Sequence, residues 1–168
     1  MGRESERELG DPPGGGAAGD SLEGRLSALE AAVEEVRRRQ VVAELRSDPA
    51  HLLSGVAETR RIVRQDLDDL AETLARWDVP LSPADELELQ RVALVAQGLS
   101  GARRATVHLV VDVAGTLSPA GLERLAAAAH VLSSRSRRTV PVIVALRPPT
   151  LEQAERAAAL GVEIVLPG

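Results

Sequence analysis

Four short apolar runs divide the C-terminal half of the chain, at residues 92–96, 106–113, 140–146 and 162–166. Runs of this length, rich in Val and Ile, are typical of strands buried on both faces. The last three are separated by segments long enough for crossover helices, which predicts parallel strands. The short segment 97–104 predicts a hairpin turn between the first two. The expected fold class is therefore α/β, with a small mixed β-sheet flanked by helices.

Helix-initiating signals support this order of elements. Ser82 and Ser118 each precede a proline, which places a capping residue before a favoured first helical residue. Thr150 is followed three residues later by Gln153, as in a capping box. We therefore expect one α/β domain over residues 82–168.

Apolar residues in the N-terminal half recur every three or four positions. In the first stretch they are Leu22, Leu26, Leu29, Val33 and Val36. This spacing predicts a coiled-coil helix over residues 21–46. In the second stretch they are Leu53, Val56, Val63, Leu67, Leu70, Leu74 and Trp77, with one interruption at Arg60. The rhythm predicts a second amphipathic helix over residues 48–78. The two helices could pair between chains as a homo-oligomer or fold back within one chain, and both arrangements bury the same stripe.

The N-terminal end has a different composition. Residues 1–20 are polar and rich in Gly and Pro, which predicts a disordered tail. We expect no signal peptide, because the N-terminus is charged and has no apolar run. No stretch is long enough to span a bilayer, so the expected location is cytoplasmic, without membrane contact.

Composition excludes several kinds of chemistry. All 20 basic residues are Arg and there is no Cys, so lysine-assisted hydrolysis, thiolate catalysis and zinc knuckles are ruled out. Trp77 is the sole aromatic side chain, which argues against base stacking on single strands. Residues 99–168 carry eight Arg and five acids, a charge of +3 that supports nucleic-acid binding only weakly. The run Arg37–Arg39 is expected to be solvated rather than a nucleic-acid contact.

Polar residues within apolar strands are the candidates for a site. Asp112 interrupts the run 106–113, and His108 shares its face about 13 Å away along the strand. The two cannot ligate one metal ion, and we expect His108 to be structural. His51 and His130 are single histidines on predicted helices, with no partner for catalysis.

Residues 82–168 resemble the PD-(D/E)XK, restriction-endonuclease-like nuclease superfamily, and in particular bacterial proteins in which a coiled coil precedes a minimal nuclease domain. The likeness lies in the helix and strand ELELQRVALVAQG, the strand VHLVVDVAGTLS, the helix GLERLAAAAHVL, the strand VPVIVAL and the ending AAALGVEIVLPG. The resemblance implies an acidic residue on the hairpin strand and a Glu-x-Lys motif on the next strand. In the family these residues bind Mg²⁺ and position the attacking water.

This chain departs from both motifs. The first acid aligns with Ala93, and the second motif aligns with Asp112, Val113 and Ala114. Asp112 is then the surviving candidate for a catalytic or metal-binding residue. Catalysis of this kind needs at least two carboxylates on one ion, so we expect no cofactor, with Mg²⁺ needed only if nuclease activity persists.

The sequence thus favours a catalytically degenerate nuclease-like protein that acts as an oligomerising interaction or scaffold module. Its protein partner is not indicated by the sequence. One alternative is a residual metal-dependent nuclease that uses Asp112. A second is a regulatory domain of the STAS type, in which Ser118 would be phosphorylated.

Overall fold

The computed structural model describes residues 22–101, 105–135 and 137–167. The predicted tail, residues 1–20, lies outside this part of the chain. The helices are α1 (Leu22–Ser47), α2 (Pro49–Leu53), the 3-10 turn η1 (Val56–Glu58), α3 (Leu67–Arg76), α4 (Pro83–Gln90), α5 (Pro119–Ser133) and α6 (Leu151–Ala159). The strands are β1 (Thr59–Arg64), β2 (Leu94–Ser100), β3 (Ala105–Ala114), β4 (Thr139–Ala145) and β5 (Glu163–Val165).

The five strands form one mixed sheet in the order β1-β2-β3-β4-β5. The pairs β1–β2 and β2–β3 are antiparallel, while β3–β4 and β4–β5 are parallel and are joined through α5 and α6. The predicted fold class, a mixed α/β sheet flanked by helices, is confirmed. The strands predicted at residues 106–113, 140–146 and 162–166 correspond to β3, β4 and β5.

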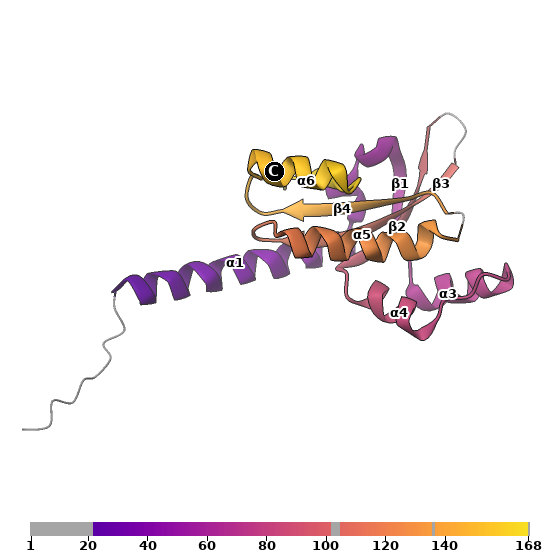
Figure 1. Cartoon of the computed structure of the whole chain (residues 1–168), viewed down its shortest axis with the longest axis horizontal. Coiled ribbons are helices and arrows are strands. Elements are labelled where there is room, and N and C mark those ends of the chain that lie inside the picture. The colour runs from indigo at the N-terminus through magenta and orange to yellow at the C-terminus, as the bar shows by residue number, and fades with distance from the viewer. Residues whose placement is uncertain (1–21, 102–104, 136, 168) are drawn as a thin grey trace, which may run out of the picture.

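Each face of the sheet carries its own aliphatic core. On one face, side chains of α3, α4, α5 and α6 pack around Val95, Val110 and Ile143. On the other, Val41 and Leu45 of α1 and Leu53 of α2 cover the opposite side chains of β2, β3 and β4. Figure 1 shows the N-terminal half of α1 extending away from this body. Among the described residues, no helix combines the length and the apolar character needed to cross a bilayer.

The prediction of a single helix over residues 48–78 is wrong. The chain forms α2, η1, β1 and α3 in this interval, and β1 joins the sheet beside β2. Gly55 adopts a left-handed conformation with φ of 89°, which interrupts the helical path. A new helix then starts at Asp66, whose side chain accepts hydrogen bonds from the N–H groups of Asp68 and Asp69. The sheet consequently begins before residue 82, the predicted start of the α/β domain.

Strand β2 also lies further along the chain than predicted, because residues 97–100 pair with β3 instead of forming a turn. Gly98 allows β1 to approach at this point: a Cβ atom there would lie 2.3 Å from Thr59 Cγ2. The β1–β2 register shifts between Arg60 and Val63, and Arg61 has a φ of 54°. This glycine therefore serves close strand packing and not chain reversal.

The helix predicted over residues 21–46 is confirmed as α1. Its pairing as a coiled coil stays a prediction. The side chains of Leu22, Leu26, Leu29, Val33 and Val36 are each at least 59% exposed in this chain.

Candidate functional site

The β2–β3 hairpin places Ala93 and Asp112 next to each other. Leu94 pairs with Val111, so the same register continued by one residue sets Ala93 opposite Asp112. Both residues line one cavity with a volume of about 490 Å³. The two positions aligned with the acidic residues of the nuclease superfamily thus face one space, and one of them carries only a methyl group.

Asp112 lies near the C-terminal end of β3, with a side chain 14% exposed. Its Oδ1 accepts a hydrogen bond from the N–H of Val113 at 2.9 Å, and its Oδ2 lies 4.0 Å from a guanidinium nitrogen of Arg124. Burial raises the pKa of this carboxyl above its usual value, although the Val113 N–H and the charges of Arg38 and Arg124 act in the opposite direction. The desolvation of the charged form is therefore only partly compensated.

Arginines from α1 and from the end of α4 form the wall of this cavity, which we call the arginine groove. They are Arg38, Arg39, Arg46 and Arg91. Arg38 Nε donates to the carbonyl of Val113 at 3.1 Å, and Arg46 Nε donates to the carbonyl of Ala93 at 3.4 Å. These bonds attach α1 to the hairpin on both sides of Asp112, the one acidic residue among those that line the groove.

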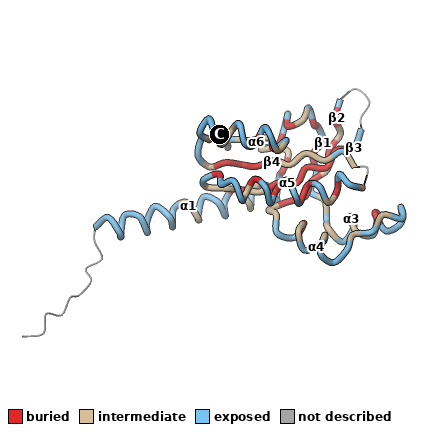
Figure 2. Tube along the Cα trace, viewed as in Figure 1, coloured by how far each residue is buried: buried red, intermediate tan, exposed pale blue. Residues whose placement is uncertain are grey.

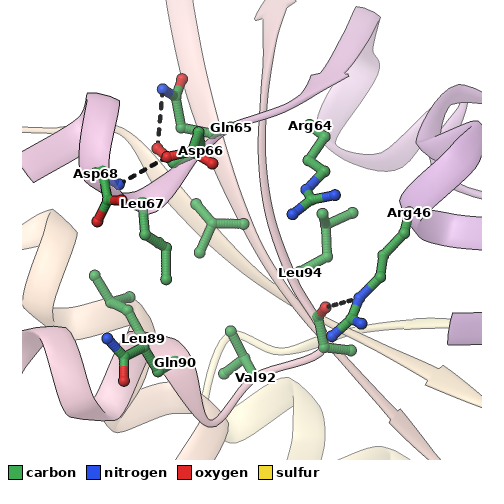
Figure 3. A pocket seen from close by; sticks show the side chains of 12 residues that line it. Arg46, Arg64, Gln65, Asp66, Leu67, Asp68, Leu89, Gln90, Val92 and Leu94 are labelled. Atoms are coloured by element: carbon green, nitrogen blue, oxygen red, sulfur yellow. Dashed lines mark hydrogen bonds between the residues drawn. The ribbon is translucent and has the colours of Figure 1, made fainter.

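Acidic neighbours partly neutralise the groove. Arg39 pairs with Glu35 at 2.8 Å and Arg91 pairs with Glu88 at 2.7 Å. A second cavity of about 230 Å³ shares Arg46, and Figure 3 shows Arg46 and Arg64 on one side of it with Asp66 and Asp68 on the other. Arg38 also forms an ion pair with Glu35, at 3.8 Å. Within the described part of the chain, no ion pair involves Arg46, which donates to the carbonyl of Ala93 instead.

The residues around Asp112 do not suit a divalent cation. Magnesium requires several oxygen ligands and favours carboxylates, whereas Asp112 has two guanidinium groups and the methyl group of Ala93 as neighbours. Within the described residues, no group of three or more His, Cys, Asp or Glu side chains is placed to hold a metal ion. A single carboxylate beside two guanidinium groups supplies too few oxygen ligands for a divalent cation.

His108 occupies the opposite end of β3 from Asp112. It is 2% exposed, its Nδ1 has no hydrogen-bond partner, and its register partner is Thr139 at the start of β4. Burial lowers the pKa of His108 to about 4, with a further contribution from the charge of Arg137. The Arg137 guanidinium stacks over the ring of Trp77 at 3.7 Å from its centroid. His108 is thus a neutral core residue and does not converge with Asp112.

The other candidates from the sequence have local roles. His51 lies 3.4 Å from Glu44 on an exposed surface, and His130 is exposed on α5. Ser118 Oγ accepts a hydrogen bond from the N–H of Gly121 at 3.1 Å and caps α5. This bond gives Ser118 a capping role in α5.

Sequence reasoning missed the part that α1 plays in the site. The run Arg37–Arg39 is exposed, as predicted. The prediction did not include the bond from Arg38 to β3 or the place of Arg39 in the lining of the groove. The available signal was the pair Val41 and Leu45, four residues apart and outside the heptad stripe. Such a second stripe indicates that another face of the same helix is buried.

Similarity to known proteins gives no assignment for this chain. Comparisons with protein-family models, with curated proteins and with solved structures find no match. Function is therefore inferred from the hairpin, the charges around it and the exposed surface of α1.

Proposed function

We propose that this chain is a catalytically degenerate relative of the PD-(D/E)XK nucleases that acts as an oligomerising interaction or scaffold module. The observation that carries the proposal is the position of Ala93 opposite Asp112 across the hairpin. The alignment with the superfamily requires these two positions to be neighbours, and they are. A cytoplasmic role fits a chain without Cys.

The charges around Asp112 support a role without cleavage. Metal-assisted hydrolysis uses a cation held by carboxylates to lower the pKa of a bound water molecule. Here Arg38 and Arg124 already supply positive charge beside the single carboxylate. A divalent cation would be repelled by both guanidinium groups and would gain only one protein ligand from this pair of strands.

The surface of α1 supports the interaction role. Most of the α1 tube before Val41 is pale blue in Figure 2, which marks exposed residues. The exposed apolar stripe lies in this part of α1 and includes none of the residues of the two sheet cores. A contiguous apolar stripe on a projecting helix typically marks a contact with another protein. We propose that a second copy of this chain covers it.

The test is an activity assay on the full chain. Single- and double-stranded DNA and RNA are incubated with the protein and either Mg²⁺ or Mn²⁺, beside Asp112→Ala as the comparison. We expect no cleavage by either chain. Metal-dependent cleavage that Asp112→Ala abolishes would replace this proposal with the residual nuclease.

A stability measurement probes the same carboxylate. Asp112→Asn should increase the free energy of unfolding at pH 7, because the amide keeps an acceptor for the Val113 N–H and buries no charge. The folded-state pKa of Asp112 is raised, so this gain is present above that raised pKa and disappears as the pH falls towards the unfolded value. Urea unfolding at pH 7 and pH 4 measures it.

The matched control for this measurement is Glu155→Gln, which makes the same chemical change at an exposed position. It should leave the stability within about 0.5 kcal/mol at both pH values. A loss of stability in Asp112→Asn would mean that the carboxylate is held by its cationic neighbours more strongly than burial opposes it.

A further inference from the structure

Helix α1 carries two apolar stripes on different faces. Val41 and Leu45 lie in the core against the sheet, whereas the stripe from Leu22 to Val36 is exposed. At about 100° per residue, the centres of the two stripes are separated by roughly 120° around the helix. A second helix can therefore pair with the exposed stripe while α1 stays packed on its own sheet.

The C-terminal half of α1 is fixed before any association. Two arginine-to-carbonyl bonds join it to the hairpin, and Glu34 forms an ion pair with Arg147 at 2.6 Å, beyond the end of β4. Helix formation is limited by its costly first turn, and this anchoring removes that cost from the pairing step. A stripe of about two heptads, marginal for an isolated peptide, is then sufficient.

We infer that α1 pairs with α1 of a second copy as a parallel, in-register, two-stranded coiled coil. This inference rests on the self-association in the proposed function and specifies its geometry. In heptad terms, Leu26, Val33 and Gln40 occupy a positions, and Leu22, Leu29 and Val36 occupy d positions. A Leu-rich d layer with Val at an a position, followed by one polar a residue, favours two parallel strands.

Flanking charges favour the parallel register. In that register Arg25 faces Glu30 of the second copy, and Arg39 faces Glu44 of the second copy, twice each by symmetry. Arg25 and Glu30 have no ion-pair partner within the described part of their own chain, so they are free to form this contact. Arg39 already contacts Glu35, and Glu44 already lies 3.4 Å from His51, so this second pair contributes less.

The antiparallel alternative is less favourable. In the antiparallel register that buries the whole stripe, Arg25 of one copy faces Arg39 of the other, and the two copies of Glu30 face each other. Both contacts are repulsive, and the one attractive contact is between Glu23 and Arg37. It also sets the amide of Gln40 against Leu22, where it has no partner. In the parallel dimer, Gln40 meets Gln40 of the second copy and the two amides can bond to each other.

Disulfide trapping tests the orientation, and the chain is suited to it because it contains no Cys. Val36→Cys in the full chain should give a covalent dimer under mild oxidation, because two d positions face each other only in the parallel register. Ala28→Cys, exposed and outside the stripe, is the control and should stay uncrosslinked. Sedimentation equilibrium should give a two-chain mass for the unmodified protein and a one-chain mass for Leu29→Arg.

Each contrary result has a distinct meaning. If Val36→Cys fails to crosslink while a mixture of Leu26→Cys and Val36→Cys chains does, the pairing is antiparallel and this inference alone is overturned. A mass of three or four chains also overturns it while leaving self-association in place. A one-chain mass at every concentration overturns both the inference and the oligomerising part of the proposed function.

Discussion

Replacing Leu45 with Ala should lower the free energy of unfolding by about 3 kcal/mol. Leu45 is fully buried and lies among side chains of β2, β3 and β4 on the face that α1 covers. Removing three carbon atoms there loses their transfer free energy and leaves a cavity that the rigid strands cannot fill. Denaturant unfolding, followed by circular dichroism at a protein concentration where the chain is monomeric, measures the effect.

The matched control is Leu151→Ala, because Leu151 is 78% exposed at the start of α6. The same chemical change there should alter stability by less than about 0.5 kcal/mol. If the two variants unfolded alike, α1 would be a separate appendage and the wall of the arginine groove would not be fixed.

Lowering the pH from about 6.5 to about 4 should destabilise the fold by up to about 3 kcal/mol through His108 alone. The folded-state pKa of His108 is about 4, against 6.5 for the unfolded chain. Between these values the unfolded state binds more protons, so stability falls as the pH falls. The cause is burial of the imidazole, followed by the nearby charge of Arg137.

The slope of stability against pH for His108→Leu isolates this contribution. The variant should lose most of the dependence between pH 6.5 and 4, whatever its absolute stability. Asp112 gives the stability a pH dependence of the opposite sign, because its pKa is raised. This contribution is the same in the unmodified protein and in His108→Leu, so it does not affect the comparison. His130→Gln, at an exposed position of α5, should keep the full slope, and a slope unchanged in His108→Leu would contradict the neutral core histidine.

Local signals in the sequence account for the C-terminal elements. Capping residues and β-branched runs act over a few residues, so Ser82, Ser118 and Thr150 start helices where the pattern predicts them. In the interval 48–78, the local pattern does not distinguish a helix from a strand. Its apolar spacing is helical on average, yet Val56 and Ile62 are buried by contact with β2 and β3, which the spacing cannot show.

One part of the candidate site could likewise be predicted from the sequence, and another part could not. The neighbouring positions of Ala93 and Asp112 could be predicted, because a hairpin between adjacent strands is local and the proposed alignment with the nuclease superfamily sets these two positions opposite each other. The arginine groove could not be predicted, because Arg38 lies 75 positions from the carbonyl that it binds. Packing of a distant helix on the sheet decides that contact, and helical periodicity gives only the face involved.

Trp77, at the C-terminal end of α3, is an intrinsic optical reporter. It is the sole Trp in a chain without Tyr or Phe, so ultraviolet-excited emission arises from one known place. The Arg137 guanidinium covers its ring, and the same arginine acts on His108. We therefore expect the wavelength and intensity of this emission to change when the buried imidazole of His108 is protonated, without any attached dye.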